Sequence, residues 1–130
     1  MIVDLYIQKN HRQYSLFGNF SLDIYVGTLY ITFVRIKPRR ELVGFYEKHA
    51  ETKSPLEAWY HEVIKENWSN PMDVLNKHGS ASPIKDNRVV FNIKGNKYRL
   101  VAKINYELKI LYIRFIGTHN EYNKINAEEI

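Results

Sequence analysis

The sequence RVVFNIKGNKYRLVAKINYELKILYIRFI, residues 88–116, alternates between apolar and polar side chains in three consecutive runs. Alternation with a period of two is typical of strands that bury one face. Gly95-Asn96 separates the first two runs and suits a tight hairpin turn. We therefore expect a meander of three antiparallel strands, at residues 88–94, 97–106 and 108–116.

The two faces of this expected sheet differ in character. The apolar face is expected to form the core and carries Val89, Phe91, Ile93, Tyr98, Leu100, Ala102, Ile104, Leu111, Ile113 and Phe115. The opposite face carries bases and no carboxylate, the bases being Arg88, Lys94, Lys97, Arg99, Lys103 and Arg114. We name this second surface the basic face.

Helical signals precede the strands. Pro38 suits a first helical turn and opens a helical spacing over residues 38–50. Ser54-Pro55-Leu56-Glu57 has the pattern of a capping box, and the apolar stripe from Leu56 to Ile64 that follows predicts a helix at 54–67. Asn70-Pro71 starts a third, short helix. Helices followed by a meander predict an α+β fold, a small antiparallel β-sheet with N-terminal helices packed on one face.

Composition narrows the class of protein. The chain has 130 residues, enough for one domain, and its net charge of +5 suggests an anionic partner. There is no cysteine, which excludes disulfides and thiolate metal sites. No apolar run reaches the ~18 residues of a membrane span, and the first residues lack the pattern of a signal peptide. We expect a cytoplasmic protein that uses no membrane.

The charge is unevenly distributed. Residues 1–33 carry two bases and two acids, so the whole excess belongs to residues 34–130. We therefore expect an N-terminal extension at 1–33 and a basic domain at 34–130. Residues 20–33 are rich in β-branched and aromatic side chains around Gly27-Thr28 and resemble a hairpin.

The basic face favours an RNA ligand. An ordinary solvated face mixes charge signs, because like charges on neighbouring strands repel. Tyr112 lies among the bases, and aromatic side chains with Arg and Lys hold single-stranded RNA by stacking and phosphate contacts. The alternative at this stage is a solvated face without a ligand.

His119 follows the third strand, on an expected turn after Gly117. A histidine beside Arg and Lys can support cleavage of RNA without a metal, in which the 2′-OH attacks the adjacent phosphorus. The alternative is an ordinary turn histidine. Metal binding by the five histidines is not expected, because no close cluster of histidines and carboxylates exists, and we expect no cofactor.

Several motifs resemble the HigB family of type II toxin–antitoxin systems. They are residues 86–100 (DNRVVFNIKGNKYRL), residues 112–122 (YIRFIGTHNEY), residues 56–60 (LEAWY) and residues 68–74 (WSNPMDV). The resemblance covers about residues 34–130.

The resemblance implies a RelE-like fold and a toxin that inhibits translation as an mRNA endoribonuclease in the ribosomal A site. It also implies a HigA-type antitoxin with a helix-turn-helix, and operator DNA bound only through the toxin–antitoxin complex. Two alternatives remain: a non-catalytic RNA-binding module, and an inactive homologue that only complexes its antitoxin.

The site residues follow from the basic face and the resemblance together. His119 matches the position of a catalytic histidine in related RelE-like nucleases and is the expected general acid. Arg99 and Arg114 are expected to stabilise the phosphorane, and Lys97 is a candidate base. The expected RNA-binding residues are Arg88, Lys94, Asn96, Lys103, Tyr112 and Tyr122.

The chain departs from the family in two places. Asn123 stands where the family usually has Asp, which removes a charge near His119. The family's first methionine aligns with Val34, so the natural product is hypothesised to start there at a GTG codon. The rival is a real hairpin that lengthens the sheet, and an intact peptide from 1–33 in the native protein would exclude the internal start.

Overall fold

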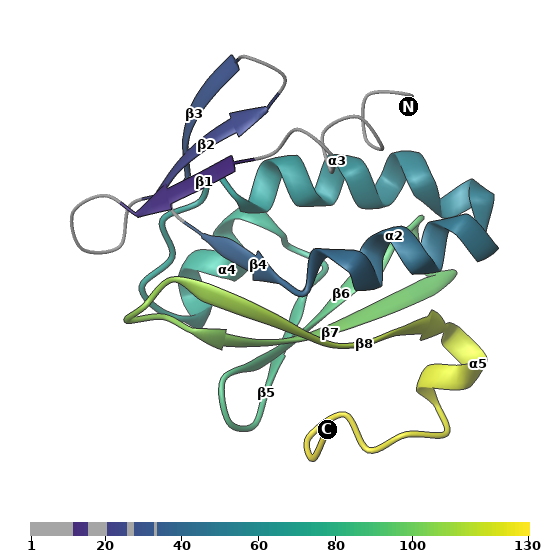
Figure 1. The fold of residues 1–130 in the computed structure, drawn as a ribbon. Coiled ribbons are helices and arrows are strands. Elements are labelled where there is room, and N and C mark those ends of the chain that lie inside the picture. The colour runs from purple at the N-terminus through teal and green to yellow at the C-terminus, as the bar shows by residue number, and fades with distance from the viewer. Residues whose placement is uncertain (1–11, 16–20, 26–27, 33) are drawn as a thin grey trace.

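The computed structural model describes residues 12–15, 21–25, 28–32 and 34–130. The main sheet has five strands. Figure 1 shows helices on one side of it, and a short helix with the C-terminal segment on the other. The strand order is β4-β8-β7-β6-β5, and the strands are β4 (Arg35–Lys37), β5 (Ser82–Ile84), β6 (Arg88–Ile93), β7 (Tyr98–Asn105) and β8 (Ile110–Thr118). The helices are α2 (Arg39–Lys48), the 3-10 turn η1 (Ala50–Thr52), α3 (Lys53–Val63), α4 (Pro71–Lys77) and α5 (His119–Tyr122).

The expected meander is confirmed. Strands β6, β7 and β8 pair antiparallel, with Phe91 opposite Leu100 and Ile104 opposite Leu111. The α+β class is confirmed too, but the sheet is mixed rather than antiparallel, because β4 runs parallel to β8. The chain crosses from β4 through the helices before it enters the meander, a connection long enough for parallel pairing.

A β-bulge on β8 changes one expected face. The pairing register shifts between Val101 and Ala102, which stand opposite Phe115 and Ile113, so that Arg114 has no partner. A bulge places two successive residues on the same side of the strand. The prediction that Phe115 faces the helices is therefore wrong, because its ring packs with Val101 on the outer face.

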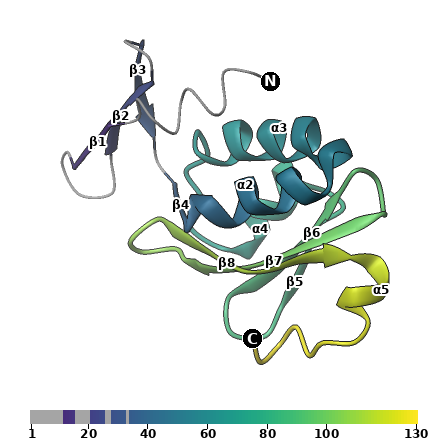
Figure 2. The same cartoon turned by 45° about the vertical axis from the view of Figure 1, so that its right-hand side comes forward.

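The main core lies between the sheet and the helices, and Figure 2 shows α2, α3 and α4 over the same face. The stripe predicted for the second helix is buried in full: Leu56, Trp59, Tyr60, Val63 and Ile64. Trp59 meets the ring of Phe91 edge-on at 5.3 Å between centroids. Burying each large side chain stabilises the fold by roughly 1.5–3 kcal/mol.

The helix ends agree only in part with expectation. Asn70 caps α4 by accepting a hydrogen bond from the Asp73 N–H (3.1 Å), with Pro71 in the first turn, as predicted. The capping box at Ser54 is wrong, since α3 begins at Lys53 with Thr52 as its N-cap and ends at Val63. The Thr52 hydroxyl donates instead to the carbonyl of His49 (2.7 Å).

The C-terminal segment covers part of the outer face. Val90 and Val101 form a second apolar cluster with Ala127, and its margin is made of Ile84, Phe115, Tyr122 and Ile130. In Figures 1 and 2 this segment lies on the side of the sheet opposite α2 and α3. The basic face is therefore only partly open.

The strands before residue 34 form a sheet of their own. β2 (Ser21–Tyr25) pairs antiparallel with β3 (Thr28–Thr32) and with β1 (Arg12–Ser15). The predicted hairpin is confirmed, although its turn lies outside the described residues. In the described part of the chain these strands do not lengthen the five-stranded sheet. The division at 33/34 and the start at Val34 stay predictions.

Among the described residues, no helix has both the length and the apolar character needed to cross a bilayer.

Candidate functional site

His119 is held beside the turn between β6 and β7. Strand β8 continues to Thr118, so the predictions that Gly117 ends it and that His119 lies on a turn are wrong: His119 begins α5. The backbone N–H of His119 donates to the carbonyl of Lys97 (3.0 Å). Its side chain is partly buried, and its Nδ1 has no hydrogen-bond partner among the described residues.

A capping box fixes the start of α5. The Thr118 hydroxyl accepts from the Glu121 N–H (3.1 Å), and the Glu121 carboxylate accepts from the Thr118 N–H (2.8 Å). Hydrogen bonding of the Glu121 carboxylate to the backbone, and then to the side chain, of Thr118 lowers the pKa of Glu121, with smaller contributions from His49 and Lys124. The four-residue helix is thus set by its own side chains at the end of β8.

Gly117 permits a close contact beneath α5. A Cβ at this position would lie 2.5 Å from Cζ of Phe115 and 3.2 Å from a carboxylate oxygen of Glu121. Phe115 in turn lies 6.4 Å from Tyr122 between ring centroids. Any larger residue at 117 would therefore disturb both the cap and the aromatic rings beside His119.

Arg99 joins the turn to α5. Its Nη1 donates to the carbonyl of Asn96 (3.2 Å), and its guanidinium lies 5.7 Å from the ring centroid of Tyr122. The expected residues Arg99, Asn96 and Tyr122 are thus brought together with His119. Asn96 takes part in the hydrogen bond with Arg99 through its backbone carbonyl, not through its side-chain amide.

Lys94 and Lys97 lie in the turn and are exposed, not on the strands as expected. Lys94 and Gly95 have φ values of 54° and 65°, the left-handed region that a tight turn uses. Lys97 Nζ lies 5.7 Å from the ring centroid of Tyr98. The turn therefore presents two exposed cations and is bonded to the backbone of His119.

Glu51 from η1 completes this end of the sheet, and sequence reasoning missed it. The Tyr98 hydroxyl donates to the Glu51 carboxylate, and this bond lowers the pKa of Glu51, as do Lys97 and Lys94. The same hydrogen bond raises the pKa of Tyr98. Glu51 reaches Tyr98 only because the helices pack against β7, so no local sequence pattern could have predicted its position.

His49 also lies at this end. It is the C-cap residue of α2, and its ring stacks on Phe45 at 4.4 Å and meets Tyr98 at 5.7 Å between centroids. Its charge acts on Glu121 of α5. Two histidines, from α2 and α5, therefore flank the same turn.

Arg88 is not on an open face, and that part of the prediction is wrong. Its side chain is buried, and its Nε donates to the backbone carbonyl of Ile130 (2.7 Å). Its Nη1 lies 3.7 Å from the carboxylate of Asp86. The C-terminal segment covers this guanidinium, so Arg88 holds the fold together in this structure.

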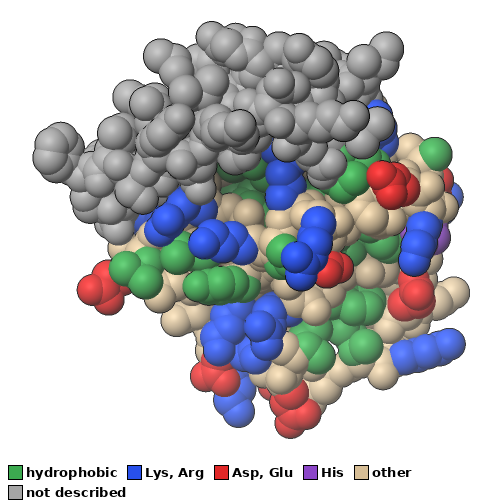
Figure 3. Space-filling model, viewed as in Figure 1, with side chains coloured by type: hydrophobic (Ala, Val, Ile, Leu, Met, Phe, Trp, Pro, Cys, Tyr) green, Lys and Arg blue, Asp and Glu red, His purple; other side chains and the backbone are tan. Residues whose placement is uncertain are grey.

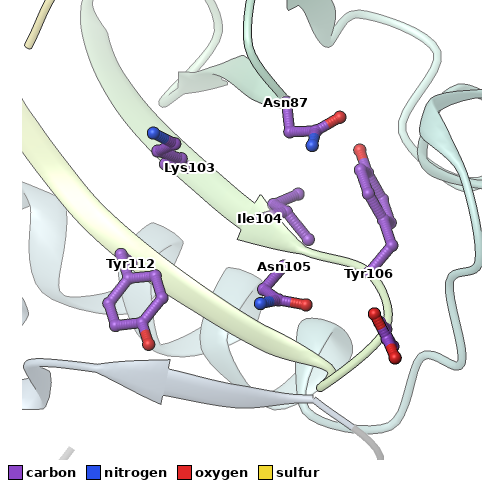
Figure 4. Close-up of a pocket in the computed structure, with 7 residues that line it drawn as sticks. Asn87, Lys103, Ile104, Asn105, Tyr106 and Tyr112 are labelled. Atoms are coloured by element: carbon purple, nitrogen blue, oxygen red, sulfur yellow. The ribbon is translucent and has the colours of Figure 1, made fainter.

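The remaining predicted residues lie farther along the sheet. Arg114 is exposed at the bulge, while Lys103 and Tyr112 face each other across β7 and β8 at the far end. Lys103 and Tyr112 line a pocket of about 360 Å³ (Figure 4). Figure 3, on the side that shows β4 and β8, has Lys and Arg side chains interspersed with apolar ones and several carboxylates.

Asn123 ends α5 and is exposed, and its backbone N–H donates to the carbonyl of His119 (3.1 Å). The described residues contain no group of three or more histidines, cysteines and carboxylates placed to hold a metal ion.

Comparison with known proteins agrees with this architecture. Residues 52–125 match the HigB toxin family, described as the RelE-like toxic component of a toxin-antitoxin system. The mRNA interferase toxin HigB of Escherichia coli is 32% identical over 83 residues, which cover 62% of this chain and 80% of that protein. The mRNA interferase HigB of Shigella flexneri matches to the same extent. This chain belongs to the HigB family of RelE-like toxins.

Proposed function

We propose that this toxin is a ribosome-dependent, metal-independent mRNA endoribonuclease that inhibits translation in the cytoplasm. The observation that carries the proposal is the bond between the His119 N–H and the Lys97 carbonyl, because it joins a histidine to the cationic turn. Lys94 and Lys97 are exposed in that turn, and Arg99 bonds to the Asn96 carbonyl of the same turn. The similarity to proteins named mRNA interferases supports RNA as the substrate.

The proposed reaction is transesterification within the RNA. The 2′-oxygen loses its proton to a base, for which Lys97 in its neutral form is the candidate, and attacks the adjacent phosphorus. Arg99 and Arg114 stabilise the extra negative charge of the phosphorane. The bond to the 5′-oxygen then breaks, and protonated His119 donates a proton to that oxygen. The products are a 2′,3′-cyclic phosphate and a free 5′-hydroxyl.

The RNA strand would follow the open part of the outer face. Lys94 and the turn around Asn96 contact phosphates, and Tyr122, already beside Arg99, stacks on a base. Lys103 and Tyr112 contact the strand at the far end of β7 and β8. Arg88 is left out of this surface, because its side chain is buried and hydrogen-bonded.

The toxin family implies an antitoxin partner. We propose that this partner is of the HigA type, carries a helix-turn-helix, and binds operator DNA as part of the complex. A neighbouring gene for a short helix-turn-helix protein would support this identity, and a neighbour of another class that neutralises the toxin would contradict it.

Induced expression tests the enzyme against its two alternatives. Wild type is expected to arrest growth and cleave mRNA, whereas His119→Ala should do neither. Asn120→Ala, at the exposed neighbouring position of α5, is the matched control and should behave as wild type. If His119→Ala cleaves mRNA as fast as wild type, the role of His119 is wrong. If wild type arrests growth without cleavage, the non-catalytic alternative replaces the enzyme.

A further inference from the structure

A pocket of about 360 Å³ opens at the end of the sheet away from His119. Its size is at the small end of the roughly 300–1,000 Å³ found for small-molecule sites. Strand β7 connects the two places: Arg99 and Lys103 share one face and are four residues apart, or about 13 Å. The C-terminal segment covers Val101 between them. An RNA strand bound at Arg99 would therefore pass beside that segment, where Arg114 is exposed on β8, to reach this pocket within a few nucleotides.

The pocket combines a stacking surface with a cation. The ring of Tyr112 is 39% exposed, and Lys103, its cross-strand neighbour, is exposed as well. Figure 4 shows Tyr112 and Tyr106 on either side of Asn105. An aromatic ring can stack on an unpaired base, and a neighbouring lysine can bind its phosphate.

Polar groups on the other side of the pocket can recognise the edge of a base. Asn105 Oδ1 accepts from the Leu108 N–H (2.9 Å), which fixes the amide so that its nitrogen lies toward Tyr112 (Figure 4). The Tyr106 hydroxyl is buried and has no hydrogen-bond partner among the described residues. Burial, and then Asp73, raise its pKa to about 12. Tyr106 packs against the core on the helix side of the sheet, so its hydroxyl does not contact a bound base. Glu107 adds a carboxylate, which only accepts.

We propose that this pocket binds one unpaired nucleobase of the substrate RNA, stacked on Tyr112 and with an amino group hydrogen-bonded to Glu107. The inference rests on the proposed function and adds a second contact point, a few nucleotides from the cleaved bond. A carboxylate accepts from an amino group such as N4 of cytosine but repels the carbonyl oxygen O4 that uracil carries at the same position. Cleavage sites should therefore be depleted of uracil at one fixed position near the cut.

Sequencing of RNA ends after induced expression tests this preference. Wild type should show about tenfold depletion of uracil at one position, and Glu107→Gln, whose amide also donates, should reduce it to threefold or less. Glu47→Gln, an exposed glutamate on α2, is the matched control and should keep the wild-type preference. Cleavage by Glu107→Gln with an unchanged preference overturns the pocket but leaves the endoribonuclease intact. A wild type that cleaves no RNA overturns the proposed function itself.

Titration with mononucleotides tests the pocket without catalysis. In ¹⁵N-labelled protein, CMP at millimolar concentration should shift the amide signals of Lys103, Asn105 and Tyr112, and UMP should bind more weakly. Tyr112→Ala should weaken CMP binding at least tenfold, whereas Met72→Ala, an exposed apolar residue on α4, should not. No shift at these amides overturns the inference. Shifts produced by the antitoxin, but by neither nucleotide, also overturn it and identify a protein-binding pocket.

Discussion

Arg88 and Arg99 lie on neighbouring strands of the same sheet and point to the same side, yet their surroundings differ. Arg88 on β6 is buried, with its Nε bonded to the carbonyl of Ile130. Arg99 on β7 is partly exposed, bonded to the carbonyl of Asn96 and adjacent to Tyr122. The difference comes from the C-terminal segment, which packs over Val90 and Val101 and leaves the turn of Lys94–Lys97 open.

This contrast assigns two roles to one type of residue. A guanidinium with its donors committed to the protein stabilises the fold, and removing it leaves an acceptor unpaired. A guanidinium beside a histidine and an open cationic turn can stabilise charge on a substrate. The following substitutions test that division, from the largest expected effect to the smallest.

Arg99→Ala should have the largest effect on activity. Loss of a cation that stabilises the transition state lowers cleavage by about 10²–10³-fold. The free energy of unfolding should change by no more than about 0.5 kcal/mol, because the residue is partly exposed. Cleavage assays and urea unfolding measure both effects, with Lys85→Ala as an exposed control. If Arg99→Ala lowers stability but not activity, the proposed difference in role between Arg99 and Arg88 is wrong.

Arg88→Ala should reverse this pattern. Loss of a buried charged hydrogen bond lowers the free energy of unfolding by about 1.5–3 kcal/mol. The dependence of RNA affinity on salt should stay that of wild type, whereas Arg99→Ala should reduce its slope by about 0.7 per lost phosphate contact. A reduced slope in Arg88→Ala would show that the C-terminal segment moves and exposes this guanidinium.

Gly117→Ala should disturb the packing of side chains at the end of the sheet that carries His119. The new methyl group displaces Phe115 and crowds Glu121, at a cost of about 1–3 kcal/mol of stability, and activity falls as α5 shifts. Gly44→Ala is the control, because nothing lies within 4 Å of its Cβ position and it should gain up to about 1 kcal/mol. Equal stability of wild type and Gly117→Ala would mean that the contact relaxes freely.

The smallest expected effect is on the pH dependence of stability, and it comes from His78, which packs against Phe91. Burial lowers the pKa of His78, against weaker opposing effects of Glu62 and Glu66, so the folded state favours the neutral imidazole. Above the unfolded pKa of about 6.5 both states are neutral. Below it the unfolded state takes up a proton first, so stability falls as pH decreases. Unfolding curves of His78→Gln should be flatter between pH 7 and 5, and parallel curves would contradict this.

Local patterns predicted most of the framework. Period-two alternation located the three strands of the meander, and the helical stripe of Leu56 to Ile64 located the buried face of α3. Both signals are local, because each strand or helix must bury one face. The same reasoning placed His119 just beyond the basic face, but on a turn, whereas it begins α5.

The predictions fail where segments that are far apart in the sequence pack against each other. Nothing in β6 shows that residues near Ala127 cover Val90 and bury Arg88. The bulge that turns Phe115 outward depends on the pairing of β7 with β8, not on the sequence of β8 alone. Glu51 and His49 reach the site because the helices dock over Tyr98. Such placements depend on tertiary contacts, which alternation does not encode.

The most direct test of this account is the chemistry of the RNA ends made by purified protein on programmed ribosomes. Wild type is predicted to leave 2′,3′-cyclic phosphate and 5′-hydroxyl ends, with His119→Ala at least 10²-fold slower and Arg88→Ala cleaving at the wild-type rate at a temperature where it is folded. Ends with a 5′-phosphate, or a His119→Ala protein as fast as wild type, would contradict the account.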